Sequence, residues 1–186
     1  MAEGGEEDPL KKQQSVFPYS VMWRGYLAIE DAQAMVMMYY ISGDFDYAKP
    51  IFPQVEVNSS ETPSTPMRIT ETKQLVREVL DEVTRRTKSD NEHCAILAIP
   101  CGKTSEAASV EGRIFKQDFL KYLKDENCMG IVKGRHPEAN QPDYLMAIFP
   151  DCEFVSTTLN VIPLRPVTRR DLHHYAHSLI IIVKAH

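Results

Sequence analysis

Two apolar segments near the N-terminus follow the spacing of β-strands. Over Val21–Ile29 apolar and polar residues alternate, which predicts a strand with one covered face and places Met22 and Trp23 on opposite faces. Residues 34–41 are almost all apolar, which is typical of a strand covered on both faces. Residues 30–31, both acidic, separate the two segments and mark a turn.

Further along the chain the apolar positions change to helical spacing. An apolar stripe at i, i+1, i+4, i+5 and i+8 over residues 75–83 predicts an amphipathic helix docked on a core. A second stripe over residues 110–124 includes Phe115, Phe119, Tyr122 and Leu123 and predicts another helix. Apolar runs predict further strands over residues 93–100, 129–132, 144–149 and 179–184.

The remaining stretches set the domain boundaries. Residues 1–16 combine two glycines, acidic residues and glutamines with almost nothing to bury, so we expect a flexible acidic tail. Residues 50–66 carry four prolines among Asn, Ser and Thr, which predicts a long surface loop. A chain of 186 residues can bury the core of one domain, which we expect over residues 17–186.

The order of these elements decides the fold class. Two strands come first, then a helix, a strand, a helix, two strands, a short helix and a last strand. This order lacks the regular alternation of strand and helix that builds a doubly wound parallel sheet. The sequence therefore predicts an α+β or barrel-like domain.

Charge and apolar run length exclude two classes of partner. The formal net charge of −5 and the isoelectric point near 5.7 argue against direct nucleic-acid binding, which calls for a basic surface. No apolar run approaches the roughly 20 residues that cross a bilayer, so we expect no membrane association.

The four cysteines predict no metal site. No C-x-x-C pair is present, and no histidine stands at zinc-finger spacing from a cysteine. All four lie in or beside apolar segments, where a free cysteine packs as a small hydrophobe; they are Cys94, Cys101, Cys128 and Cys152.

Two motifs carry the alternative hypothesis, a small NTP-dependent or metal-dependent enzyme. Gly102-Lys103-Thr104 follows an apolar strand and precedes a helix, as in a phosphate-binding loop, but Leu97 stands where that loop needs a glycine. His173 and His177 lie four residues apart on an expected short helix, which is suitable spacing for a metal pair, yet only Asp171 is a nearby acidic ligand. We favour structural roles for both motifs.

Two further surfaces are candidates for macromolecular ligands. Tyr39, Tyr40 and Tyr47, if exposed, are candidate stacking platforms for single-stranded RNA, against which the acidic balance argues. A basic cluster would form if the two helical regions pack side by side, and it would suit an acidic or phosphorylated peptide. Its members are Arg68, Lys73, Arg77, Lys121, Lys124 and the hydroxyl of Tyr122.

Three short blocks occur in a specific order along the chain. They are Trp23-Arg24-Gly25-Tyr26-Leu27-Ala28, then Leu97-Ala98-Ile99-Pro100-Cys101-Gly102, then Asn140-Gln141-Pro142-Asp143-Tyr144 running into Ile148-Phe149-Pro150. In order and in amino-acid sequence these blocks resemble the SPOC domain, the Spen paralogue and orthologue C-terminal domain of split-ends transcriptional regulators, over roughly residues 19–186.

The resemblance implies a fold and a function. SPOC domains are distorted seven-stranded β-barrels surrounded by helices, they are not enzymes, and no cofactor is implied. They bind acidic, serine-phosphorylated motifs in nuclear-receptor corepressors, the RNA polymerase II tail and chromatin-modifying complexes. We therefore expect a nuclear protein-interaction module of a transcriptional co-repressor, acting as a monomer.

The resemblance also implies a peptide-binding site. The family's arginine after the proline-rich loop matches Arg68, and the aromatic residue of its second long helix matches Tyr122. Lys73 and Lys121 each stand one residue from a matched position, and a one-residue shift in a strand turns a side chain to the opposite face. The predicted site comprises Arg68, Tyr122, Lys73 and Lys121.

Four positions that are basic in the family are not basic here. They are Glu30, Thr72, Gln74 and Glu126. The two glutamates would pair with a basic partner or repel a phosphate, which is one way for a scaffold to change its specificity.

Overall fold

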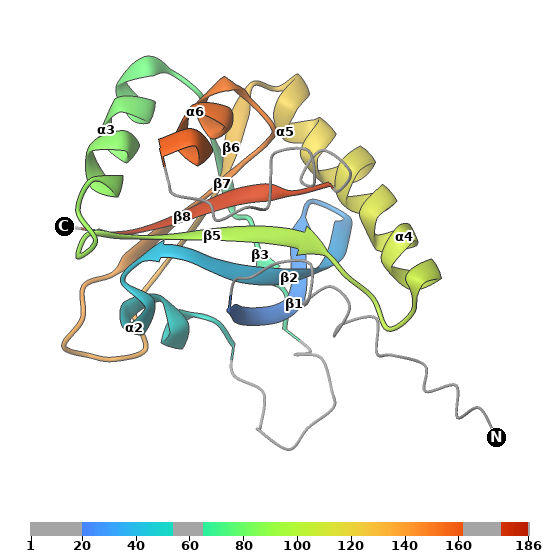
Figure 1. Ribbon diagram of the computed structural model, residues 1–186, viewed down its shortest axis with the longest axis horizontal. Helices are drawn as coiled ribbons and strands as arrows, with labels where there is room; N and C mark the ends of the chain where they lie inside the picture. The colour runs from blue at the N-terminus through green and yellow to red at the C-terminus, as the bar shows by residue number, and fades with distance from the viewer. Residues whose placement is uncertain (1–19, 54–64, 162–175, 186) are drawn as a thin grey trace.

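The computed structural model describes residues 20–53, 65–161 and 176–185, and in this part of the chain eight strands form a single sheet (Figure 1). The order across the sheet is β3-β1-β2-β5-β8-β7-β6-β4, and every neighbouring pair is antiparallel except β1 with β3. The strands are β1 (Val21–Ile29), β2 (Ala32–Gly43), β3 (Met67–Arg68), β4 (Glu71–Gln74), β5 (His93–Pro100), β6 (Cys128–Gly134), β7 (Tyr144–Phe149) and β8 (Ser178–Lys184).

The two end strands of the sheet follow one another directly in the chain. Ile69 and Thr70 join β3 to β4, and the N–H of Ile69 donates to the carbonyl of Ala28, whereas the N–H of Thr70 donates to that of Ile131. The segment that spans β3 and β4 thus bonds first to β1 and then to β6, which curls the sheet into a barrel-like shape. Counted as one strand, this segment gives the seven strands of the expected distorted barrel, and the α+β class is confirmed.

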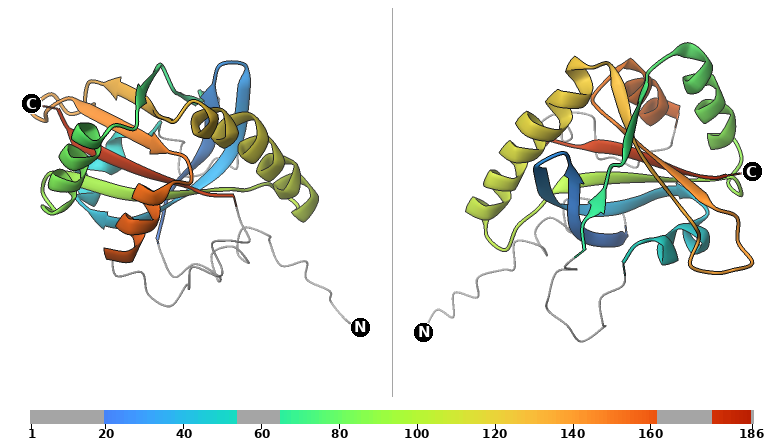
Figure 2. Two further views of the ribbon diagram at one scale, coloured as in Figure 1. Left: turned by 90° about the horizontal axis from the view of Figure 1, so that it is seen from above. Right: turned by 180° about the vertical axis from the view of Figure 1, so that it is seen from behind.

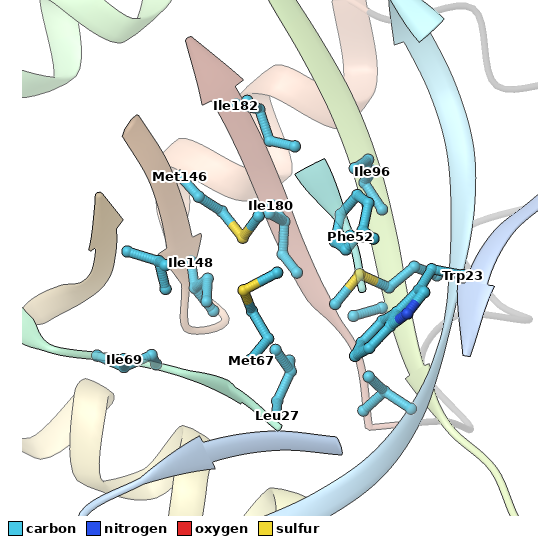
Figure 3. Close-up of a cluster of buried hydrophobic side chains, with 14 of the residues drawn as sticks. Trp23, Leu27, Phe52, Met67, Ile69, Ile96, Met146, Ile148, Ile180 and Ile182 are labelled. Carbon is cyan, nitrogen blue, oxygen red and sulfur yellow. The ribbon is translucent and has the colours of Figure 1, made fainter. Parts of the chain in front are cut away.

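Alternate residues of β2 enter two separate hydrophobic clusters, as the two-residue repeat of a strand requires. The inner cluster fills the concave side of the curled sheet, where side chains from β1, β5, β7 and β8 point toward one another (Figure 3). The inner cluster takes Ala34, Val36 and Met38, and the outer cluster takes Met35, Met37 and Tyr39.

Helices cover both clusters. The continuous helical run α4 (Ser105–Ile114), η2 (Phe115–Leu120) and α5 (Lys121–Asp125) buries Phe115, Phe119 and Leu123 in the inner cluster. Both α3 (Arg77–Thr87) and α6 (Glu153–Val161) pack on the outer cluster, through Val83 and Val155. The short elements α2 (Phe45–Ala48) and η1 (Lys49–Ile51) follow β2.

Most predicted elements are confirmed, with three corrections. A bulge in β1 between Val21 and Trp23 places Met22 and Trp23 in the same cluster instead of on opposite faces. Ile51 and Phe52 are buried, so the predicted surface loop does not begin at residue 50. The second helical run begins at Ser105, ahead of the predicted residue 110. Residues 1–16 and 54–64 lie outside the described part of the chain.

Candidate functional site

Arg68 lies on β3 at one border of the curled sheet. Its guanidinium Nη1 donates to the backbone carbonyl of Glu30 at 2.9 Å, while the side chain stays exposed. Glu30 occupies the turn between β1 and β2 with a φ of 48°, in the left-handed region that is uncommon for residues other than glycine. This turn therefore holds the arginine in place through its main chain.

The other end of the segment contacts the helical run. Gln74 Nε2 on β4 donates to the carbonyl of Glu126, just after α5, at 3.2 Å. Thr72 lies two residues before Gln74 and hydrogen-bonds the thiol of Cys128. Burial raises the pKa of this thiol, and the hydrogen bond from Thr72 partly offsets that shift. Thr72 and Gln74 therefore face the same side of the segment.

Tyr122 lies on α5, one turn before Glu126, and 38% of its surface is exposed. In a regular α-helix, Tyr122 would follow Phe115 by about two full turns and share its buried face. Residues Phe115–Leu120 instead form a π turn, which takes in one extra residue and rotates the helix that follows. Leu123 is consequently fully buried, and Tyr122 turns aside toward solvent.

Six of the positions singled out in the sequence lie along β3 and β4 and on the two elements that these strands contact. We call them the β3–β4 surface, and Figure 2 shows β3 and β4 running between the β1–β2 hairpin and β6. Side-chain hydrogen bonds join Arg68 to the carbonyl of Glu30 and Gln74 to the carbonyl of Glu126, and Tyr122 lies one helical turn before Glu126. The surface comprises Glu30, Arg68, Thr72, Gln74, Tyr122 and Glu126.

Lys73 and Lys121, the other two predicted site residues, make different contacts. Lys73 is paired with Met129, whose side chain is in the outer cluster, whereas Gln74 is paired with Cys128 of the inner cluster. Since directly paired residues share a face, Lys73 points away from Gln74. Lys121 forms an ion pair with Asp125, with Nζ and Oδ2 2.5 Å apart.

The comparison with protein families decides the identity of this fold. The model of the SPOC domain matches residues 13–183. The chain belongs to the SPOC domain family. SPOC domains of split-ends proteins are protein-interaction modules, so a surface for a protein ligand is expected on this scaffold.

Similar proteins agree with this assignment. Over 180 residues, 97% of this SPOC domain, the chain is 29% identical to Msx2-interacting protein of Mus musculus. Over 164 residues, 88% of the chain, it is 32% identical to Protein split ends of Drosophila melanogaster. The chain spans only 5% and 3% of the lengths of these two relatives. The crystal structure of the SPOC domain of human PHD-finger protein 3 shares the fold, with a TM-score of 0.53 at 14% identity, over 90% of this chain and 99% of that one.

The Gly102-Lys103-Thr104 motif of this SPOC domain begins a helix. The Thr104 hydroxyl accepts a hydrogen bond from Ala107 N at 3.0 Å and so caps α4. A Cβ on Gly102 would lie 2.5 Å from Ala108 N, so the glycine allows the chain to pass directly against this first turn. Close packing of the chain against the first turn of α4 therefore accounts for this glycine.

The remaining candidate sites are the tyrosines considered for stacking on RNA and the histidine pair considered for binding a metal. Tyr39 and Tyr47 are only 1% and 4% exposed, so the hypothesis that they stack on RNA is wrong. Tyr40 is partly buried, and its ring packs on Phe45 while its hydroxyl donates to the carbonyl of Gly43 at 2.6 Å. Of the predicted metal pair, His173 lies outside the described residues and His177 immediately precedes β8. Within the described ranges no group of His, Cys, Asp and Glu side chains could hold a metal ion. No helix there has the length and apolar character to cross a membrane.

The interpretation of the cysteines as packing residues is confirmed, since Cys152, although only partly buried, packs against the outer cluster. Cys94, Cys101 and Cys128 are buried, and Cys152 is partly buried. Burial raises the pKa of both Cys94 and Cys101 to about 12, so neither thiol is reactive at neutral pH.

Sequence reasoning did not anticipate how the site residues are held. Arg68 and Gln74 both donate to backbone carbonyls, and a backbone acceptor leaves no signature in residue type. The sequence also gives no sign of the left-handed φ of 48° at Glu30, because the turn contains neither glycine nor asparagine. Only the match to family positions indicated that these residues belong together.

Proposed function

We propose that this SPOC domain is a nuclear protein-interaction module of a transcriptional co-repressor. Its ligand is a short acidic motif in a corepressor or in a partner associated with the RNA polymerase II tail, and the motif binds on the β3–β4 surface. Membership of the family and similarity to split-ends proteins support this role. Both the unphosphorylated and the serine-phosphorylated form of such a motif are candidate ligands.

The observation that carries the proposal is the state of Arg68. Its guanidinium has five N–H donors, and the hydrogen bond to the carbonyl of Glu30 uses one of them. The side chain is exposed, so the other donors are available for a carboxylate or phosphate, which guanidinium binds in a bidentate manner. An arginine fixed by the main chain loses less conformational entropy when it binds.

Tyr122 supplies the second contact. Its exposed ring is one of three large hydrophobic side chains left at the surface in the described ranges, with Val76 and Val110. Tyrosines are enriched among residues that dominate binding energy, because the ring packs and the hydroxyl hydrogen-bonds. We expect the ring to cover an apolar residue next to the acidic one.

Fluorescence titration tests the proposal, with a labelled acidic corepressor-tail peptide in both serine and phosphoserine forms. Loss of a charge-assisted hydrogen bond costs about 1.5–3 kcal/mol, so Arg68→Ala should weaken binding at least about tenfold. Tyr122→Ala should weaken it comparably. Arg85→Ala is the matched control, because this arginine is 60% exposed near the end of α3 and pairs with Glu82, and the variant should bind as the wild type does.

Two results would contradict the proposal. The first is that neither peptide form binds at any accessible concentration, which would exclude acidic motifs as ligands. The second is that binding of either form is unchanged in both Arg68→Ala and Tyr122→Ala, which would place the binding site away from the β3–β4 surface.

A further inference from the structure

The two ends of the β3–β4 surface differ in their charged groups. At the hairpin end the exposed cation Arg68 lies beside Glu30, whose side chain is also exposed. At the helix end the ionisable side chain is that of Glu126, which is exposed and forms no ion pair with any described residue. Thr72 and Gln74, between the two ends, are neutral.

The cations near the helix end do not pair with Glu126. Lys73 points to the opposite side of β4, and Lys121 forms an ion pair with Asp125. Lys124 stands two residues before Glu126, about 200° away around the helix, and so faces a different direction. Lys133 forms an ion pair with Glu71 at 2.6 Å. Each of these lysines either faces elsewhere or already has a carboxylate partner.

The spacing between the ends is set by the chain itself. Six residue steps separate Arg68 from Gln74, and an extended strand rises about 3.3 Å per residue, so the two ends lie at most about 20 Å apart. Gln74 in turn contacts the carbonyl of Glu126. An extended peptide that reaches both ends therefore needs at most about five residues between its contacting side chains.

We propose that this site binds a motif of mixed charge, with an acidic residue at Arg68 and a lysine or arginine at Glu126, and that phosphorylation of the motif near Glu126 weakens binding. This inference rests on the proposed function of the same surface. The carboxylate of Glu126 attracts an ammonium or guanidinium group. It repels a phosphate, which carries a charge of about −1.5 to −2. The neighbouring groups from β4 are neutral and supply no compensating charge.

The experiment is a titration of this domain with a matched set of labelled peptides. Each peptide has one aspartate and, about five residues away, a position occupied by lysine, alanine, serine or phosphoserine. Each set is made with the aspartate first and with the aspartate last, because the direction of the bound peptide is one of the results. All are measured at one salt concentration.

In one of the two directions, the lysine peptide should bind about twofold to fivefold more tightly than the alanine peptide, which is the range that exposed ion pairs give. The phosphoserine peptide should bind more weakly than the serine peptide by a similar factor. Glu126→Lys should reverse both preferences. Glu78→Lys is the matched control, since it makes the same charge change at an exposed position on α3 and should reverse neither.

Two outcomes overturn the inference and leave the proposed function standing. The first is that the phosphoserine peptide binds more tightly than the serine peptide, with both still dependent on Arg68. The second is that the preference for lysine persists in Glu126→Lys. By contrast, if Arg68→Ala changes the affinity of no peptide in the set, the proposed function itself fails.

Discussion

Two regions of this domain use the same kinds of side chain for different purposes. One is the Tyr47 cluster, which we define as Asp44, Tyr47, His136 and Lys184; the other is the β3–β4 surface. Each contains a tyrosine, a cation and a carboxylate. In the first the groups bind one another and the main chain, whereas in the second the arginine and the tyrosine are left facing solvent.

The Tyr47 cluster is closed by its own hydrogen bonds. The Tyr47 hydroxyl donates to the carbonyls of Pro142 and Asp143 at 2.9 and 3.1 Å, and Lys184 Nζ lies 4.9 Å from the centre of its ring. His136 stacks on the same ring and donates from Nε2 to the Tyr47 carbonyl at 2.7 Å. Residue type alone therefore does not distinguish a structural tyrosine from a binding one; the completeness of its hydrogen bonds does.

The largest expected effect comes from truncating each tyrosine. Tyr47→Ala should destabilise the domain by about 3–5 kcal/mol, as loss of a large buried aromatic side chain does. Tyr122→Ala should change stability by less than about 0.5 kcal/mol, because the side chain is partly exposed and its loss leaves no buried group unpaired. Urea unfolding of the two variants measures both values. Equal destabilisation would erase the distinction between the regions.

Removing only the hydroxyl of Tyr47 sharpens the comparison. Tyr47→Phe leaves the carbonyl of Pro142 without its donor, at a cost of about 1–2 kcal/mol, and Tyr122→Phe should cost nearly nothing. Burial, the larger cause, and the nearby charge of Asp143 raise the pKa of Tyr47 to about 12. The folded state therefore holds this proton more tightly than the unfolded state, and stability falls as the pH rises from about 10 to 12.

Unfolding measured across this alkaline range should show a shallower decline for Tyr47→Phe than for the wild type. Burial also raises the pKa of Tyr144, Cys94 and Cys101, so the difference between the two proteins, rather than the total decline, reports Tyr47. The Tyr122→Phe control should follow the wild-type slope. An identical slope in all three proteins would show that the Tyr47 phenol does not contribute.

Lys184 of the Tyr47 cluster and Lys121, which precedes Tyr122 on α5, differ in the same way. Lys184 pairs with Asp44 at 3.1 Å, and the two side chains are only 19% and 28% exposed. Lys121 pairs with Asp125, with side chains 65% and 58% exposed. Lys184→Met should therefore destabilise by about 1 kcal/mol and Lys121→Met by less than about 0.5, measured by thermal unfolding. A larger loss in Lys121→Met would contradict this order.

The sequence predicted those elements whose burial shows in their composition. The strands β2 and β5 are nearly continuous apolar runs because both faces are covered, and their pattern is local. The strand β4 has the residues Glu71–Gln74, all exposed and all polar, so nothing in the pattern indicates a strand. It forms because β6 needs a partner where the curled sheet closes, and that requirement comes from the tertiary fold.

The candidate site was predicted only as far as matched positions allowed. The family resemblance assigned both Arg68 and Tyr122 to the site. Helical periodicity, however, placed Tyr122 in a buried stripe, because the spacing of apolar residues does not reveal the π turn over Phe115–Leu120. The roles of Lys73 and Lys121 depend on the register with β6 and on Asp125. Register and ion pairing are set by contacts between segments, which a linear pattern does not record.

The smallest expected effect concerns Glu30, where main chain and side chain can be separated. Glu30→Gly keeps the carbonyl that accepts from Arg68 and suits the left-handed φ of 48°, so the gain from relieved backbone strain and the entropy cost of glycine should nearly cancel. We expect a change in stability within about 0.5 kcal/mol. Loss of the carboxylate beside Arg68 should strengthen binding of an acidic peptide about twofold, measured by titration. Weaker binding would mean that the carboxylate of Glu30, rather than its carbonyl, orients Arg68. In that case side chains would hold the β3–β4 surface in place, as they do in the Tyr47 cluster, and the two regions would not differ in this respect.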